Sequence, residues 1–187
     1  MTRAAFLDRD GVINKKAPDD HYVIRWEDFH FLPGVVEGIA QLNRAGLRVI
    51  VVTNQRCVAK GLLTEAELIN LHQRMTEHLA RAGATIDAIY YCPHGHEACC
   101  NCRKPAPGML LEAARFHGID LAASWMIGDS NSDIQAGKSA GCRTARLSGK
   151  QRVENDREKG SAFPMDAEIT ASSFLDLIHQ ILQLGHS

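Results

Sequence analysis

Short runs of apolar residues alternate along the chain with longer stretches in which apolar positions recur every three or four residues. The short runs favour buried strands, and the longer stretches favour amphipathic helices. A Thr-x-x-Glu pattern at Thr64 is typical of a helix start, because its two side chains can cap the backbone. We expect strands over 4–7, 48–53, 86–92, 125–128, 143–147 and 168–170, and helices over 35–44, 64–81, 108–117, 132–140 and 174–184.

The alternation of strand and helix predicts an α/β fold, with a Rossmann-like parallel sheet between two helix layers. A chain of 187 residues suits one domain with a sizeable core. We therefore expect a single domain over 1–187 that ends in a tail helix at about 171–185. The polar stretch 148–164 predicts a loop or a marginal helix.

Polar side chains follow four of the predicted strands, at the end where each strand stops. Each group has an ordinary alternative, since such residues also cap helices and form turns. The carboxyl ends of parallel strands meet at one edge of a sheet, where ligands of α/β proteins bind. One such group could stand at a strand end by chance, but four groups at four strand ends indicate a shared site. The residues are Asp8 and Asp10 after the first strand, Thr53 and Asn54 after the second, Lys104 after the third, and Asp129 and Asp133 after the fourth.

The pair of acids that ends the first strand is the most informative feature. Asp8 and Asp10 stand one residue apart, before Gly11. Alternate residues of a strand share a face, so both carboxylates can point out of the strand end, where they can hold a divalent cation or act as nucleophile and acid/base. An Asp-x-Asp-Gly string is also a common turn. The glycine comes too early for an EF-hand loop, and Ser132 stands where a P-loop needs its first glycine.

Charge and hydropathy narrow the class of protein. The formal net charge of −1 and the lack of a long basic stretch argue against a nucleic-acid partner. No apolar run approaches the ~20 residues of a membrane span, and the first strand begins too early to leave room for a signal peptide. We expect a cytoplasmic monomer that binds neither nucleic acid nor membrane.

Four of the six cysteines gather in one short segment. In a reducing compartment such a cluster favours a metal site over disulfides, and two pairs of soft ligands suit tetrahedral zinc. Free thiols with a redox role are the alternative, and side-chain direction leaves Cys99 and Cys100 open as ligands. The pairs are Cys92-x-His94 and Cys100-x-Cys102, whereas Cys57 and Cys142 are isolated and are expected in the core.

The order of these motifs resembles the haloacid dehalogenase superfamily of phosphatases, and the resemblance covers 4–147. Within the superfamily, the chain is similar to the family of D-glycero-D-manno-heptose-1,7-bisphosphate 7-phosphatases, and the histidinol-phosphate phosphatases share much of the pattern. The segments that carry the likeness are Phe6-Leu7-Asp8-Arg9-Asp10-Gly11, Val51-Val52-Thr53-Asn54-Gln55, Tyr90-Tyr91-Cys92-Pro93-His94, Cys100-Asn101-Cys102-Arg103-Lys104-Pro105 and Pro107-Gly108-Met109-Leu110-Leu111.

The resemblance implies a role for each motif residue. Asp8 would attack phosphorus and form an aspartyl-phosphate, while Asp10 would protonate the leaving oxygen and then activate water. The other implied roles are Mg²⁺ binding by Asp8, the backbone carbonyl of Asp10 and Asp129, with Asp133 behind these ligands; contacts of Thr53 and Lys104 with the non-bridging phosphate oxygens; substrate contacts of Asn54 and Arg103; and a structural Zn²⁺ bound by Cys92, His94, Cys100 and Cys102, where the resemblance selects Cys100.

The implied activity is Mg²⁺-dependent removal of the 7-phosphate from D-glycero-D-manno-heptose 1,7-bisphosphate, a small phosphorylated sugar used to make nucleotide-activated heptose for the lipopolysaccharide core. A histidinol-phosphate phosphatase and a catalytically silent, zinc-stapled binding protein are the alternatives. The interval between Asp10 and Thr53 is too short for a large cap domain, so we expect a capless enzyme whose substrate is embraced by 14–31 and by the zinc-stapled loop. A long 15–20 stretch and Cys57, where relatives usually have glycine, leave the substrate open.

Overall fold

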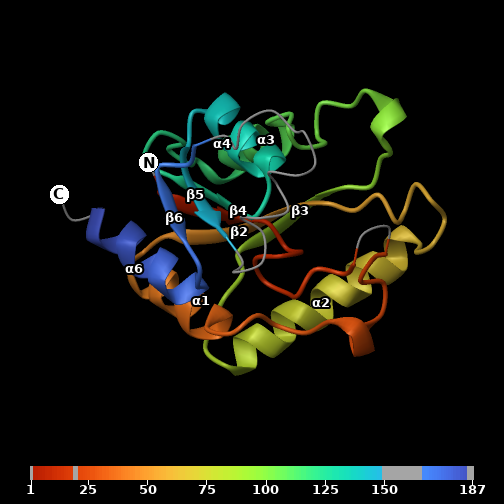
Figure 1. Ribbon diagram of the computed structural model, residues 1–187, viewed down its shortest axis with the longest axis horizontal. Helices are drawn as coiled ribbons and strands as arrows, with labels where there is room; N and C mark the ends of the chain where they lie inside the picture. Colours follow the sequence, from red (N-terminus) through yellow and green to blue (C-terminus); the bar gives the residue numbers. More distant parts are fainter. Residues whose placement is uncertain (1, 19–20, 149–165, 185–187) are drawn as a thin grey trace.

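The computed structural model describes residues 2–18, 21–148 and 166–184. They form a six-stranded parallel sheet with the strand order β3-β2-β1-β4-β5-β6 and helices on both faces (Figure 1). The predicted α/β fold is confirmed. The strands are β1 (Ala4–Leu7), β2 (Arg48–Asn54), β3 (Ala88–Cys92), β4 (Trp125–Gly128), β5 (Arg143–Leu147) and β6 (Ile169–Ala171).

The helices begin and end within two residues of the predicted positions. The Thr64 side chain accepts a hydrogen bond from the backbone of Glu67, whose carboxylate accepts one from the backbone of Thr64. This capping box starts the longest helix where the sequence indicated. The elements are α1 (Val35–Arg44), α2 (Glu65–Arg81), α3 (Gly108–His117), α4 (Asn131–Ala140) and α6 (Phe174–Leu184), with short 3₁₀ turns η1 (Trp26–Asp28) and η2 (His96–Ala98).

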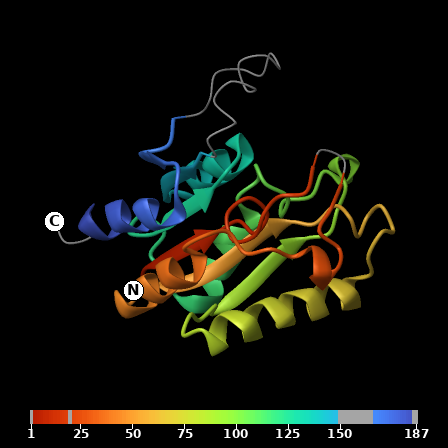
Figure 2. The same ribbon diagram turned by 60° about the horizontal axis from the view of Figure 1, so that its bottom comes forward.

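Both faces of the sheet are buried, and successive residues of β1 pack into different helix layers. Ala5 and Leu7 belong to the core shared with α1, α2 and α6, whereas Ala4 and Phe6 belong to the core shared with α3 and α4. Figures 1 and 2 show these two groups of helices on opposite sides of the sheet. This arrangement explains why the strands read as continuous apolar runs.

The strand order places the functional edge of the sheet. The chain runs from β1 outward to β2 and β3, then crosses back so that β4 lies on the other side of β1. Such a reversal opens a crevice at the carboxyl ends of the two central strands. The ends of β1, β2 and β4 therefore meet at one place, which is where the predicted acids lie.

Two smaller predictions concern the isolated cysteines and the polar stretch 148–164. Cys57 and Cys142 are buried, as expected. The prediction for 148–164 lies outside the described residues apart from Ser148. In the part of the chain that the structure describes, none of the helices is long and apolar enough to cross a membrane.

Candidate active site

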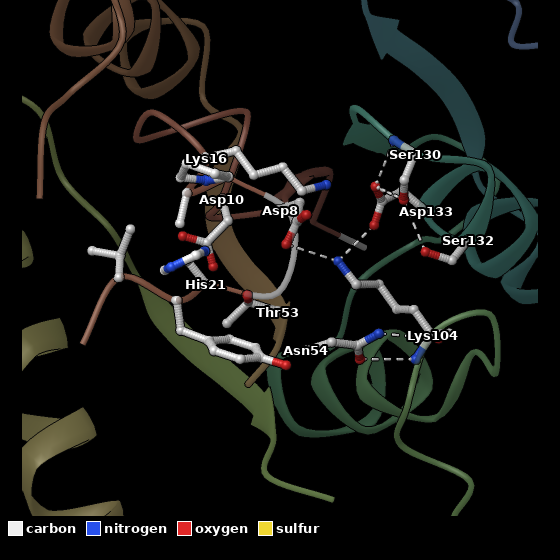
Figure 3. A pocket seen from close by; sticks show the side chains of 14 residues that line it. Asp8, Asp10, Lys16, His21, Thr53, Asn54, Lys104, Ser130, Ser132 and Asp133 are labelled. Atoms are coloured by element: carbon white, nitrogen blue, oxygen red, sulfur yellow. Dashed lines mark hydrogen bonds and ion pairs between the residues drawn. The ribbon is translucent and has the colours of Figure 1, made fainter. Parts of the chain in front are cut away.

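A cavity of about 300 Å³ opens at the carboxyl edge of the sheet (Figure 3). Predicted residues from four separate segments line it together with residues of the 14–31 segment, whereas Asp129 is not part of the lining. Its lining comprises Asp8, Asp10, Lys16, Ala17, Pro18, His21, Tyr22, Val23, Thr53, Asn54, Lys104, Ser130, Ser132 and Asp133.

A buried lysine joins two of the acids. The Nζ atom of Lys104 lies 2.9 Å from Asp8 Oδ1 and 2.6 Å from Asp133 Oδ1, and it donates a hydrogen bond to the carbonyl of Val52 at 2.7 Å. Its side chain is only 2 % exposed. Figure 3 shows the ammonium group between the two carboxylates. Lys104 thus brings a full positive charge to the floor of the cavity.

The charges in this cluster shift one another's protonation. Burial alone would lower the pKa of Lys104, but the carboxylates of Asp133 and Asp8 raise it above its usual value. Burial alone would raise the pKa of Asp133, but Lys104 holds it below its usual value. Burial raises the pKa of Asp8 to about 7 against the opposing effect of Lys104. Further positive charge beside Asp8 would favour its carboxylate form.

The backbone of Lys104 is fixed by Asn54. The side-chain amide of Asn54 donates to the Lys104 carbonyl and accepts from the Lys104 N–H, both at 3.0 Å. Asn54 lines the cavity, as a substrate-contacting residue should, and each end of its amide already makes one hydrogen bond to the Lys104 backbone. The contacts make Asn54 a support for Lys104.

Asp10 is held by a different set of donors. Arg9, Asn14 and Gln55 all donate hydrogen bonds to its carboxylate at 2.9–3.0 Å. Burial alone would raise the pKa of Asp10, but the Arg9 charge and these hydrogen bonds keep it below its usual value. Gln55 also donates to Thr53 Oγ1 at 2.9 Å, so the ends of β1 and β2 are linked through polar side chains.

Three acids form a group with the donor chemistry of a hard cation. Asp8, Asp129 and Asp133 each offer a carboxylate oxygen, and these oxygens lie within 4.8 Å of one another. Oxygen ligands of this kind suit Mg²⁺. The family resemblance implies that Asp133 lies behind the ligands, whereas in the structure its carboxylate belongs to the same group of oxygens. Lys16 reaches the same place, with Nζ 3.3 Å from Asp129 Oδ2.

Two glycines make room for this acidic group. Gly11 has φ +93°, and a Cβ atom there would collide with the Asp129 carboxylate. A Cβ atom on Gly128 would collide with the Asp133 side chain. The close approach of bare backbone is therefore what lets these two acids reach the end of β1.

The cysteine segment forms a second cluster beyond the end of β3. In this cluster, neighbouring sulfur and nitrogen ligand atoms lie 3.2–3.6 Å apart. They belong to Cys92, His94, Cys100 and Cys102. Four ligands at about 2.0–2.3 Å from one zinc ion lie about 3.4–3.8 Å apart, so the cluster fits a tetrahedral zinc site. Cys99 has φ +45° and is exposed, and it stands outside the cluster.

Arg103 and the loop before it lie differently from what the sequence suggested. The Arg103 guanidinium donates to the carbonyl of His94 at 3.1 Å and lies 3.2 Å from Nε2 of His96. Of the two segments expected to embrace the substrate, 14–31 lines the cavity, but 92–104 contributes only Lys104. Apart from Lys104, the cysteine-rich loop thus lies outside the lining of the cavity.

Sequence reasoning missed the residues that hold the acids in place. Arg9 is 1 % exposed and Gln55 is 2 % exposed, and neither was assigned a role. A signal existed for Arg9: strand alternation turns it away from the face shared by Asp8 and Asp10. A cation directed into the protein needs buried partners. No comparable signal marks Lys16 or His21, which reach the cavity from a loop.

Comparisons with known proteins agree with this arrangement. A model of the family described as haloacid dehalogenase-like hydrolase matches residues 12–138. The D-glycero-beta-D-manno-heptose-1,7-bisphosphate 7-phosphatase of Rhodopseudomonas palustris is 43 % identical over 79 % of this chain and 84 % of its own. The enzyme of the same name from Vibrio cholerae is 41 % identical over 97 % of both chains.

A solved structure is also similar over nearly the whole length. The D,D-heptose 1,7-bisphosphate phosphatase of B. bronchiseptica, complexed with magnesium and phosphate, superposes with a TM-score of 0.87. It is 35 % identical in sequence, and the match covers 98 % of this chain and 99 % of that one.

Proposed function

We propose a specific reaction from the premise that this chain belongs to the haloacid dehalogenase-like hydrolases. The reaction is hydrolysis of the 7-phosphate of D-glycero-β-D-manno-heptose 1,7-bisphosphate, the substrate named for its relatives. The observation that carries the proposal is the cavity in which Asp8, Lys104 and Asp133 meet. Hydrolysis of a phosphate ester needs a nucleophile and a fixed positive charge, and this cavity offers both.

Asp8 is the proposed nucleophile. Its carboxylate would attack phosphorus, so that a bond forms from its oxygen to phosphorus while the bond to the sugar oxygen breaks. The product of this step is an aspartyl-phosphate, which water then hydrolyses. Support comes from the position of Asp8 at the end of β1, where it lines the cavity and pairs with Lys104.

Asp10 is the proposed acid and base. It would give a proton to the departing sugar oxygen and later take one from the attacking water. The lowered pKa of Asp10 favours its carboxylate form, so it would take up the first proton in the substrate complex, where the negative charge of the phosphate raises that pKa. Lys104 and Thr53, which line the same cavity, would contact the non-bridging oxygens. Charge that develops on those oxygens would be stabilised by a cation that is already in place, without reorganisation.

Mg²⁺ would be held by the group of oxygens around Asp8, Asp129 and the backbone carbonyl of Asp10, with Asp133 beside them. When bound, it supplies positive charge that lowers the repulsion between the phosphate and the carboxylates. The fit rests on three carboxylate oxygens within 4.8 Å of one another and on the bare glycine backbone that lets them approach.

Chelation should stop the reaction. Without a divalent cation, the dianionic phosphate must approach several carboxylates, whose charge Lys104 and Lys16 offset only in part. We expect EDTA to abolish phosphate release and added Mg²⁺ to restore it, as measured by a free-phosphate assay. Zinc content is measured in the same samples, because EDTA can also remove zinc. Full activity in EDTA, with zinc as the sole bound metal, would contradict the Mg²⁺ assignment.

Zinc would be held by Cys92, His94, Cys100 and Cys102, in a closed structural site. The loop between them has few apolar residues, and ordering its backbone costs roughly 1–2 kcal/mol per residue. Bound zinc offsets this cost and fixes the backbone that leads into Arg103 and Lys104. The proposal is supported by ligand-atom distances that suit a tetrahedral ion.

A pair of serine variants separates the ligands from their neighbour. Cys102→Ser should lose stoichiometric zinc and weaken catalysis, because the segment that carries Lys104 loses its anchor. Cys99→Ser should keep both zinc and activity, since Cys99 is exposed and outside the cluster. Metal analysis of the purified proteins decides the matter. Zinc retained in Cys102→Ser, or lost only in Cys99→Ser, would overturn this ligand set.

A substrate panel tests the proposed activity. The panel contains both anomers of the heptose bisphosphate, fructose bisphosphate and histidinol phosphate. We expect the β-heptose bisphosphate to have the highest kcat/KM and to yield a product that keeps its 1-phosphate. A higher kcat/KM for histidinol phosphate would replace the proposed substrate, and no turnover of any ester with Mg²⁺ present would favour a silent binding protein.

A further inference from the structure

The side chain between the two motif acids is a fully buried cation. Arg9 is 1 % exposed, and its guanidinium donates to Asp10 Oδ1 and Oδ2 from Nη2, at 3.0 and 2.9 Å. Phe29 packs against it, with its ring centre 5.9 Å from Cζ. A buried cation without partners would be costly, so the site gains a fixed guanidinium only because these groups surround it.

Asp10 is therefore restrained on both of its oxygens. Oδ1 accepts from Arg9 and from Asn14 Nδ2, and Oδ2 accepts from Arg9 and from Gln55 Nε2. Arg9 and Asn14 belong to the segment after β1, and Gln55 belongs to the loop after β2. Together they fix the plane and the position of the carboxylate, which a freely rotating aspartate would not keep.

The far side of the guanidinium is occupied by a histidine of α2. Nη1 of Arg9 lies 3.2 Å from Nε2 of His72, and His72 is 4 % exposed. Arginine has only donors, so Nε2 must be the unprotonated, accepting nitrogen. Burial and the Arg9 charge lower the pKa of His72 to about 3, which keeps the ring neutral and able to accept.

We propose that Arg9 and His72 are positioning residues for Asp10: Arg9 fixes the carboxylate, and His72 fixes Arg9. The inference rests on the proposed phosphatase reaction, in which Asp10 protonates the leaving oxygen. These contacts link the Asp8–Asp10 segment to α2, a helix that contributes no residue to the lining of the cavity.

The leaving group of the substrate provides the test. A sugar alkoxide leaves slowly unless it is protonated, whereas p-nitrophenolate leaves without help from an acid. The ratio kcat/KM reports steps only up to departure of the leaving group. A displaced Asp10 should therefore lower kcat/KM for the sugar phosphate much more than kcat/KM for p-nitrophenyl phosphate.

His72→Leu removes the acceptor and keeps an apolar side chain of similar size. We expect kcat/KM to fall about tenfold or more for the heptose bisphosphate, a part of the 10²–10⁴-fold that general acids contribute. For p-nitrophenyl phosphate it should change less than about threefold. His72→Gln, whose amide oxygen can accept from Arg9, should restore most of the loss. Because the two substrates are compared on one sample, a reduced folded fraction cancels.

Asp10→Asn separates failure of this inference from failure of the proposed function. It must show the same preference for the good leaving group, and if it slows both substrates equally, the role of Asp10 itself is wrong. If Asp10→Asn behaves as expected but His72→Leu slows both substrates equally, or slows neither, the positioning role is overturned. Failure of His72→Gln to recover the sugar-phosphate rate would also contradict it.

Discussion

Asp8→Asn is expected to abolish hydrolysis of every phosphate ester, with a loss of several orders of magnitude in kcat/KM. The amide has nearly the shape of the carboxylate, but it does not attack phosphorus, and it cannot form the aspartyl-phosphate. The change also removes a negative charge beside Lys104 and from the proposed Mg²⁺ site. Covalent and electrostatic contributions therefore disappear together.

The variant should remain folded, which makes the loss interpretable. Lys104 keeps its 2.6 Å ion pair with Asp133 and its hydrogen bond to Val52, so no buried cation is left alone. Circular dichroism and the urea midpoint should stay close to those of the wild type. Phosphate release is measured on highly purified protein, and substantial residual activity there would refute the assignment of the nucleophile.

Asp8 could be foreseen because its position follows from local pattern. A four-residue apolar run that stops at two acids and a glycine predicts both the strand and the place where its end lies. The same holds for β2 and β4, whose ends carry Thr53 and Asp129. In strands that are buried on both faces, the polar residues that follow an apolar run show where the strand ends.

The residues that hold the acids could not be foreseen in the same way. His72 looks like one more member of the buried face of α2, together with Leu68, Leu71 and Met75. Its contact with Arg9 depends on where α2 lies against the segment after β1, and no local pattern encodes that placement. Arg103 likewise fits the family's sequence motif, but its guanidinium contacts His94 and His96, because the folded loop presents the carbonyl of His94 there.

The choice between Cys99 and Cys100 shows the same limit. Adjacent cysteines have equal chemistry, and only a resemblance favoured Cys100. In the structure, the left-handed backbone of Cys99 directs the two side chains apart, so that only Cys100 joins the cluster. The backbone conformation of a short loop depends on contacts with the rest of the fold, and the local sequence does not encode those contacts.

Lys104→Met should damage both activity and stability, because one side chain serves two purposes. For activity, the cavity loses the cation proposed to hold the phosphate oxygens, and we expect kcat/KM to fall by at least about 10²–10³-fold. For stability, Asp8 and Asp133 lose their shared partner in a buried site. Breaking such a pair on one side costs about 3–5 kcal/mol. Urea unfolding at neutral pH, in the presence of EDTA, measures this loss.

The pH dependence identifies the cause of the instability. In the wild type, Lys104 keeps the pKa of Asp133 below its unfolded value, so the stabilisation is present above that value and is lost as pH falls through the folded pKa. In Lys104→Met, burial instead raises the pKa of Asp133, and the resulting penalty is relieved as the carboxylate takes up a proton. The difference in the free energy of unfolding should therefore be largest at neutral pH and should narrow as the solution is acidified.

A lysine on the same helix as Asp133 provides the matched control for this experiment. Lys138 is an exposed residue of α4, so Lys138→Met removes an equal charge without uncovering a buried acid. It should change the free energy of unfolding by no more than about 0.5 kcal/mol, with no dependence on pH of the kind expected for Lys104. A gap between wild type and Lys104→Met that stays constant or widens toward acid would mean that lost packing, and not the unpaired carboxylates, causes the instability.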